Sequence, residues 1–385
     1  MVARVAVKPD LLQWAVERAG WDSETAQQKA PQLEKWLDGS RLPTLKQLEK
    51  FASSTHIPFG FLFLEEPPIE DVPIPDMRTI GNKAVPQPSA DLLDTIYLCQ
   101  SRQEWFRDHA QEYGLEQPLF IGTATLQTPS SRVAEVIRRT LHFEIADRHE
   151  FVSWETSFRA LIDRIEEMGV LVMVNGVVGN NNHRKLDPVE FRGFALADEW
   201  APLIFINGAD TKATQNFTII HKLAHLYLGH SALSDATMTA TDGFAEELWC
   251  NQVAAEALVP LEGIRTDYRG DTTLDELRHL STKYRASTLV VLRRIFDAGL
   301  IDWDNYRRLY SEERDRLLAL VGSKQKRSGG GDYYNTQPLR LSRHFARAVI
   351  ASTLHGSTSY RDAYSLLGVR KHSTFEKLAA QLGVI

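Results

Sequence analysis

The distribution of proline limits how this chain can fold. Six of its 16 prolines lie between Glu65 and Asp91, namely Pro67, Pro68, Pro73, Pro75, Pro86 and Pro88. Each proline fixes φ and removes a backbone donor, so neither a helix interior nor a central strand tolerates this density. Residues 65–90 are therefore predicted to form an extended linker.

A second break is expected at residues 322–332, GSKQKRSGGGD, where three consecutive glycines follow a basic run. This stretch offers no apolar side chains to bury. The two breaks divide the 385 residues into segments 1–64, 91–321 and 333–385. A chain of this length is expected to contain more than one folding unit.

The composition is typical of a soluble globular protein, with 43% hydrophobic and 24% charged residues. No run approaches the roughly 18 to 20 apolar residues of a membrane helix, and the N-terminus lacks the apolar region of a signal peptide. Two cysteines, Cys99 and Cys250, are too few for a disulfide framework. We therefore predict a cytoplasmic protein with no membrane partner.

The net charge of -6 is distributed unevenly. Residues 1–64 carry +1 and residues 322–385 carry +7, so the stretch between them carries -14. A solvated basic face is the commonest reason for such a tail. A docking surface for a protein and a phosphate-binding face are the two functional interpretations of its cations, Arg340, Arg343, Arg347, Arg361, Arg370 and Lys371.

Apolar residues at helical spacing predict several short helices in residues 1–64. Ser23 is expected to cap one helix, Gly39 to end another, and Pro43-Thr44 to open a further one. The stretch LEKWLDGSRLP followed by TLKQLEKFASSTHIP resembles the phage-repressor (Xre) class of helix-turn-helix domains. The resemblance implies that the second helix of the pair enters the major groove of double-stranded DNA.

The predicted DNA-contacting side chains are donors suited to phosphates and base edges, namely Gln27, Gln28, Lys29, Gln32 and Lys35. A net charge of +1 is small for a DNA-binding segment. A helical module for protein binding or dimerisation, with no DNA contact, is the alternative interpretation.

The middle segment is predicted to be α+β, and the whole chain to be mostly helical. The expected elements are helices at residues 131–141, 155–168 and 212–228 and strands at residues 170–174, 191–197 and 203–206. Asp210 is expected to cap the third helix and Gly229 to end it. The strand Leu203–Ile206 could add a substrate peptide by edge pairing, or serve packing alone.

Two histidines on the predicted helix 212–228 are candidate metal ligands. His221 and His225 are four residues apart, so they lie on one helical face and can place two imidazole nitrogens about 2 Å from one zinc ion. A third ligand is expected from the alanine-rich helix within residues 244–260, which begins with Glu246 and Glu247. A catalytic site would keep the fourth position for water.

The stretch FRGFALADEWAPLIFINGADTKATQNFTIIHKLAHLYLGHSALSD, followed by EELWCNQVAAEALVP, resembles the ImmA/IrrE zinc metallopeptidases. One branch of that family joins an N-terminal Xre-type domain to the peptidase and ends in a basic helical tail like RLSRHFARAVIASTLHG. The resemblance implies a zincin-like domain that holds Zn²⁺ through His221, His225 and Glu247. Glu247 lies four residues before Asn251, in the family's E-x-x-x-N pattern, and Glu246 is the alternative third ligand.

Lys222 departs from this family pattern. The zincin motif H-E-x-x-H has at this position a glutamate that takes the proton from zinc-bound water. An ammonium cannot accept a proton, and its charge opposes cation binding. Loss of a general base costs about 10² to 10⁴ in rate, so catalysis is predicted to be impaired. A lysine held neutral by the nearby cation is the less favoured alternative base.

Three neighbouring features also have alternative interpretations. His230 lies five residues beyond His225, not the six of the metzincin pattern, and is predicted not to be a ligand. Cys250 could compete for zinc, although a small buried hydrophobe is the more typical role. Residues 261–320 are predicted to be helical and to brace the peptidase domain, with a second DNA-reading unit as the alternative.

The resemblance implies a regulator of a mobile-element or toxin-antitoxin-like locus. In the enzymatic hypothesis the protein cleaves a repressor, or another regulator encoded nearby. In the alternative it is a non-catalytic, antitoxin-like transcriptional regulator that binds its operator DNA and a toxin. By analogy with symmetric repressors, a homodimer is also expected.

Overall fold

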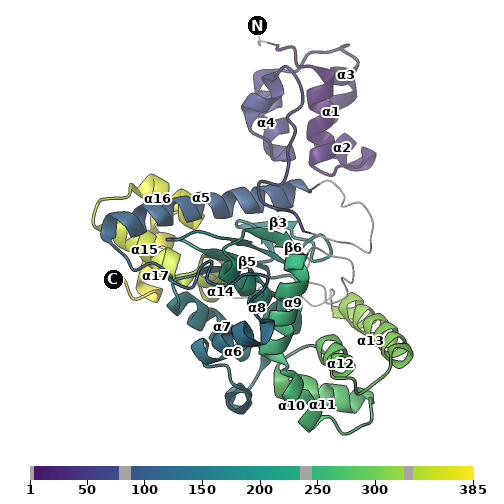
Figure 1. The fold of residues 1–385 in the computed structure, drawn as a ribbon. Helices are drawn as coiled ribbons and strands as arrows, with labels where there is room; N and C mark the ends of the chain where they lie inside the picture. Colours follow the sequence, from purple (N-terminus) through teal and green to yellow (C-terminus); the bar gives the residue numbers. More distant parts are fainter. Residues whose placement is uncertain (1–3, 78–87, 235–244, 325–332) are drawn as a thin grey trace. The chain divides into compact units, whose positions relative to one another are not determined.

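The computed structural model describes residues 4–77, 88–234, 245–324 and 333–385 (Figure 1). Its architecture is α+β and mostly helical, with one small mixed sheet, which confirms the predicted fold class. Two compact units are present: one comprises residues 1–73 and 86–96, and the other comprises residues 74–85 and 97–385. The first predicted linker thus contributes residues to both units.

The first unit is a cluster of short helices with a common core. Its elements are α1 (Pro9–Arg18), α2 (Ser23–Lys29), α3 (Leu33–Leu37), α4 (Leu45–Thr55) and the 3₁₀ helix η1 (Phe59–Phe63). Buried apolar residues of α1, α3 and α4 form this core, and the ring of Phe51 in α4 makes T-shaped contacts with the rings of Trp21 and Trp36, with ring centres 6.1 and 5.9 Å apart.

Two helices of this unit, α2 and α4, begin with a side-chain cap. Thr44 caps α4 in a reciprocal capping box with Gln47, as the sequence predicted for this start. The expectation that Ser23 caps α2 is wrong, because Asp22 is the cap and its carboxylate accepts from Thr25 N at 2.8 Å. Aspartate outcompetes serine here because it lies one residue earlier, with extended backbone that aims its side chain at the helix.

The second unit contains a four-stranded sheet in the order β1-β5-β4-β6. The strands are β1 (Leu171–Asn175), β4 (Gly193–Leu196), β5 (Leu203–Asn207) and β6 (Ala232–Ser234), and a separate hairpin is formed by β2 (Val177–Val178) and β3 (Asn181–Lys185). β5 pairs in parallel with β1 and antiparallel with β4. Both sides of β5 are therefore hydrogen-bonded, so edge pairing of a substrate with Leu203–Ile206 is wrong and the alternative, a role in packing, agrees with the structure.

β6 lies at one border of this sheet, and a segment of the proline-rich stretch continues the sheet beyond it. Leu233 N donates to Pro75 O at 2.9 Å, and Met77 N donates to Leu233 O at 2.8 Å. Asp76 and Leu233 form a parallel bridge. Residues 75–77 therefore cover the outer side of β6, where Pro75 contributes only its carbonyl.

Both faces of the sheet are covered, which explains why β1, β4 and β5 are buried along their whole length. Ile204 and Ile206 join the main apolar core that also contains α7 (Trp154–Glu167) and α8 (Lys212–Leu228). On the other face, Gln103 of α5 (Ala90–Tyr113) donates to Leu196 O and Ala201 O at 3.1 and 2.8 Å.

The remaining helices complete the second unit. They are α6 (Ser130–Thr140), η2 (Ile145–Glu150), α9 (Ala245–Leu258), α10 (Leu261–Asp267), α11 (Leu274–Tyr284), α12 (Thr288–Asp297), α13 (Trp303–Lys324), α14 (Tyr333–Leu341), α15 (Arg343–Leu354), α16 (Tyr360–Leu367) and α17 (His372–Gln381). α13 continues past residue 322, where the second linker is predicted to begin. Residues 325–332 of that linker lie outside the described part of the chain.

The helix that bears the histidines has the predicted bounds, Lys212–Leu228. Gly229 ends it in the left-handed region at φ 73°, where glycine carries no Cβ penalty. The expected cap, Asp210, is wrong: Thr211 is the cap and accepts from Thr214 N at 3.3 Å. In the described ranges, no helix combines the length and the apolar character needed to cross a bilayer.

Candidate metal centre

α8 is buried on all sides from Gln215 to Leu228, a consequence of its packing against the sheet, α7 and α9. Most of these residues are apolar, yet His221, Lys222 and His225 are each 0% exposed. Burying such groups costs free energy unless they find partners, so their position within a core demands a compensating arrangement.

The ring nitrogens of His221 and His225 converge with the carboxylate of Glu247. The two Nε2 atoms are 3.1 Å apart, and Glu247 oxygens lie 3.2 Å from His221 Nε2 and 3.0 Å from His225 Nε2. Tetrahedral zinc with bonds of about 2.0 to 2.1 Å separates its ligand atoms by about 3.3 Å. The three donor atoms thus have the spacing and the chemical types of a metal site.

Two helices create this arrangement. The spacing of the histidines places both rings on one face of α8, and α9 packs alongside so that its first turn brings Glu247 to that face. Only 4% of Glu247 is exposed. The ligand group assembled by the described residues contains all three predicted ligands, His221, His225 and Glu247.

Electrostatics favour the ligand forms of two members of this group. Burial disfavours the imidazolium and lowers the pKa of His221 to about 4, despite the nearby carboxylate. Burial opposes ionisation of Glu247, but the two histidines and Lys222 outweigh it and hold its pKa well below the usual range. A neutral imidazole and an ionised carboxylate are the protonation states that bind metals.

Glu246, the alternative third ligand, has a different position in the structure. Its Oε1 accepts from His225 Nδ1 at 3.0 Å, on the side of the ring opposite the converging Nε2. Its Oε2 accepts from His230 Nδ1, also at 3.0 Å. Glu246 therefore fixes the orientation and tautomer of His225, as a carboxylate behind a metal-binding histidine does.

The sequence analysis predicts Glu246 only as an alternative ligand, not in this orienting role. The adjacent pair Glu246-Glu247 nevertheless indicates that the two carboxylates have different partners. Successive helix residues differ in direction by about 100°, so two neighbouring carboxylates cannot address the same nitrogen. The pKa of Glu246 is lowered because the hydrogen bonds from His225 and His230 outweigh its partial burial. His230 itself lies beyond the end of α8, outside the ligand cluster.

Cys250 is 0% exposed and lies against His225. Burial raises the pKa of the Cys250 thiol, which keeps it in the neutral form that binds metals poorly. Burial also opposes charge on His225, but the hydrogen bonds to the carboxylates of Glu246 and Glu247 outweigh it and raise the pKa of that imidazole.

Lys222 follows the first histidine and is fully buried at this site. Its positive charge contributes to the low pKa of Glu247 and of His221. A cation therefore occupies the sequence position at which the zincin motif has a proton-accepting carboxylate, and it does so inside the core where solvent screens it least.

The predicted DNA-contacting residues form no such cluster. Gln27, Gln28, Lys29 and Lys35 are exposed, on α2 and α3, and Gln32 is half-buried between these helices. Their contacts are local: Gln28 donates to Glu24 at 3.2 Å, Gln32 accepts from Arg41 at 3.1 Å, and Lys29 Nζ lies 5.0 Å from the centre of the Trp21 ring.

Comparison with known families supports the peptidase resemblance for part of the chain. Residues 165–296 match the model of a peptidase family described as the IrrE N-terminal-like domain. This part of the chain is therefore similar to that peptidase family. The match spans the sheet, α8 and α9, and hence all three converging side chains.

A second match covers residues 341–381, which correspond to a domain of unknown function (DUF8813) and include α15, α16 and α17. Searches of curated proteins and of solved structures gave no significant match.

Proposed function

We propose that this protein is a regulator built on an ImmA/IrrE-type scaffold, in which His221, His225 and Glu247 hold Zn²⁺ and Lys222 strongly reduces hydrolysis. The observation that carries the proposal is the convergence of two imidazole nitrogens and one carboxylate at mutual distances of 3.0 to 3.2 Å inside the core. Burying these polar groups in the core costs free energy, and binding of a metal ion would compensate that cost.

Several features of the site fit zinc in particular. Two nitrogens and one carboxylate oxygen form the donor set of many catalytic zinc sites, which keep a fourth position for water. In the neutral form of His225, the hydrogen bond to Glu246 places the ring proton on Nδ1, which leaves the lone pair of Nε2 available to a metal ion. When bound, Zn²⁺ would supply an activated water and polarise a peptide carbonyl.

Lys222 decides which reaction the scaffold supports. Hydrolysis needs a group that accepts a proton near the attacking water and returns it to the leaving amine. A buried ammonium beside the ligands cannot accept that proton, and its repulsion of a cation weakens metal binding. The negative charge of Glu247 offsets this repulsion in part.

The same observation favours a second candidate function. A completely buried lysine at the position of the general base is compatible with a site retained for structure or binding. In this candidate the protein is a non-catalytic, antitoxin-like regulator of the cytoplasm that binds a toxin and represses its own operon. In both candidate functions the helical first unit binds double-stranded operator DNA and the protein acts as a homodimer. The DNA-contacting residues in this proposal are Gln27, Gln28, Lys29, Gln32 and Lys35.

The first experiment measures bound zinc in the purified chain and in the variant His221→Ala. We expect about one equivalent of zinc in the original chain and none in the variant. Absence of zinc from the original chain, after purification without chelators and after incubation with zinc salts, would overturn the metal-binding proposal.

The second experiment restores the proton acceptor by Lys222→Glu, with Lys222→Gln as a control that removes the charge without adding a base. The probes are the purified proteins encoded by the genes that flank this one. Cleavage at least 100-fold faster in the glutamate variant than in the control, and abolished by chelator, is expected for a competent peptidase scaffold. No cleavage by any form, while all forms neutralise the toxin, would select the antitoxin-like function.

A further inference from the structure

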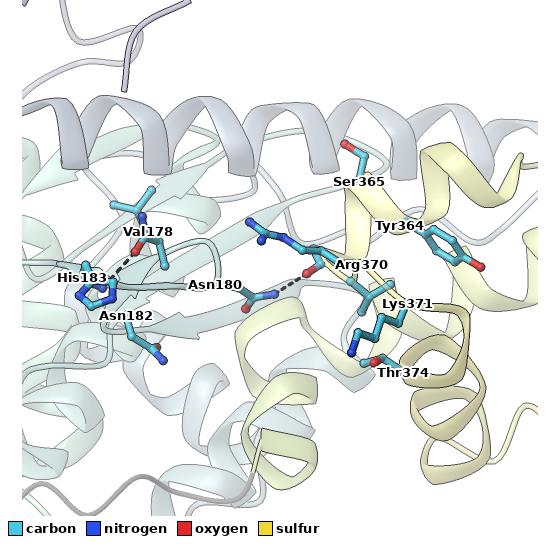
Figure 2. Close-up of a pocket in the computed structure, with 12 residues that line it drawn as sticks. Val178, Asn180, Asn182, His183, Tyr364, Ser365, Arg370, Lys371 and Thr374 are labelled. Carbon is cyan, nitrogen blue, oxygen red and sulfur yellow. Dashed lines mark hydrogen bonds between the residues drawn. The ribbon is translucent and has the colours of Figure 1, made fainter. Parts of the chain in front are cut away.

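A large cavity lies outside the metal centre, in the second unit. It has a volume of about 1060 Å³ and is bordered on one side by the β2–β3 hairpin and on the other by α16, α17 and the turn between them (Figure 2). This volume is slightly above the usual range for small-molecule sites, about 300 to 1000 Å³. The cavity brings the IrrE-like domain and the region of the second family match together.

The walls of this cavity carry positive charge and hydrogen-bonding groups but no carboxylate among the described residues that line it. Arg370 and Lys371 supply two cations, His183 supplies an imidazole, and three consecutive asparagines of the hairpin supply amides: Asn180, Asn181 and Asn182. Residues 170–186 and 363–375 contain no acidic residue. This is unusual in a chain with a net charge of -6, and it favours an anionic ligand.

The turn that carries the cations is anchored by hydrogen bonds from three other segments. Three side chains from separate elements donate to three successive carbonyls: Arg102 of α5 to Leu366 O at 3.1 Å, Gln337 of α14 to Leu367 O at 3.2 Å, and Asn180 of the hairpin to Gly368 O at 2.8 Å. Arg102 and Gln337 are buried. Such anchoring fixes the backbone that precedes Arg370 and reduces the ordering cost of binding a ligand.

Gly368 shows how closely the two walls meet. It adopts φ +64°, and a Cβ at this position would lie 2.6 Å from Nδ2 of Asn180. Figure 2 shows Asn180 reaching across to this turn, with Arg370 and Lys371 following it. The Asn180 side chain therefore helps to position the turn that precedes Arg370 and Lys371.

Neither Arg370 nor Lys371 forms a salt bridge with any residue within the described ranges. Lys371 also precedes the first turn of α17, where no side chain caps the helix. The first N–H groups of a helix lack intrahelical acceptors and carry partial positive charge, which attracts phosphate. Two cations and an uncapped helix start therefore meet at one end of the cavity.

We propose that this cavity binds a nucleotide-sized phosphorylated ligand. Its phosphates contact Arg370, Lys371 and the start of α17, and its base and sugar contact the amides of Asn181 and Asn182. Amide side chains provide both a donor and an acceptor, which matches the polar edges of a base. The volume exceeds the needs of inorganic phosphate, so the ligand has an organic part of matching size.

Binding is tested by calorimetry on the full chain with ATP, GTP, adenosine, inorganic phosphate and a short blunt-ended DNA duplex as probes. We expect a nucleotide to bind with an affinity that falls with salt, and adenosine not to bind measurably. The double variant Arg370→Glu/Lys371→Glu should weaken nucleotide binding by about 10- to 100-fold. The double variant Arg361→Glu/Lys377→Glu changes the net charge equally, at exposed positions of α16 and α17 outside the cavity, and should leave binding unchanged.

A further variant, Asn180→Ala, removes the bond to Gly368 O without changing any charge and should weaken nucleotide binding while leaving the circular dichroism spectrum unchanged. Equal loss of binding in the two double variants would show a general charge effect and overturn the proposal. So would the failure of both nucleotides to bind. If only the DNA duplex binds, and the Arg370→Glu/Lys371→Glu variant abolishes this binding, then the cavity binds nucleic acid and the nucleotide proposal is wrong.

Discussion

The two sets of residues that the sequence singled out have opposite environments. The histidine-glutamate group is buried in a core, where its three donor atoms point at one another within 3.2 Å. The candidate DNA-contacting residues lie at the surface of the first unit, where they contact their own neighbours. Exposure of this kind costs nothing and is the default for glutamine and lysine.

Burial restricts the function of a group of residues more than exposure does. A buried polar cluster must be compensated, so its geometry restricts the chemistry that it can perform. An exposed set of donors is compatible with DNA, with a protein partner or with water alone. The metal-binding proposal can therefore be tested by removing one ligand side chain, whereas the DNA-binding proposal can be tested only with the DNA present.

The largest effect is expected from Glu247→Ala. This change leaves two buried imidazoles without their carboxylate, so zinc should be lost and the free energy of unfolding should fall by about 3 to 5 kcal/mol. Zinc content and thermal unfolding measure both effects. The matched control is Glu262→Ala, because the Glu262 side chain is 86% exposed, and its unfolding should change by less than about 0.5 kcal/mol. Equal behaviour of the two variants would remove the contrast between buried and exposed groups.

Glu246→Gln tests the orienting role separately from ligation. The amide keeps the size of the side chain but removes the charge that holds the His225 Nδ1 proton, so zinc affinity should fall by about 10- to 100-fold while one equivalent still binds. Competition with a fluorescent chelator at fixed pH measures the affinity. An unchanged affinity would show that Glu246 has no influence on the ligand histidine.

Glu166 separates burial from metal binding, because it is a buried carboxylate far along the sequence from the ligands. Burial raises the pKa of Glu166 to about 7, even though it accepts from Arg343 N at 3.0 Å. Since the pKa is higher in the folded state than its ordinary value of 4.5, the stability it contributes is present below pH 4.5 and is lost as pH rises through about 7.

The variant Glu166→Gln should therefore flatten this part of the stability profile, by on the order of 2 kcal/mol between pH 4.5 and pH 8. Urea unfolding across this pH range measures it, with zinc content as the second reading. Loss of zinc in this variant would contradict the separation of burial from ligation.

The smallest effect is expected in the first unit. Lys29→Ala combined with Lys35→Ala should weaken binding to the upstream DNA by about tenfold and lower the salt dependence by about two ions. Gel shifts at several salt concentrations measure this, with Lys46→Ala/Lys50→Ala of α4 as a matched pair. If the original chain gives no gel shift with this DNA at low salt, the DNA-binding proposal is wrong and the protein-binding interpretation of this unit remains.

Some of the site was predictable because the signals are local. The bounds of α8 follow from a run of helix-compatible residues ended by Gly229, and the spacing of His221 and His225 places both rings on one face. The helix caps were predicted less well. The cap of α2 is Asp22 and not Ser23, and the cap of α8 is Thr211 and not Asp210. Adjacent polar residues compete for the capping position, and backbone geometry selects between them.

Long-range features could not be obtained in this way. The central position of β5, the coverage of β6 by residues 75–77 and the bond from Asn180 to Gly368 join segments far apart in the chain. Strand order and these contacts depend on how whole elements pack, which no local pattern encodes.

The amino-acid order is sufficient to predict the chemical types at the candidate metal centre, namely two imidazoles, a carboxylate and Lys222, together with the helices that carry them. Only the tertiary structure decided that Glu247 faces the histidine nitrogens while Glu246 supports His225 from behind. The physical reason is that the relative rotation of α8 and α9 is set by packing across the whole core, and this rotation selects which of two adjacent carboxylates reaches the shared point.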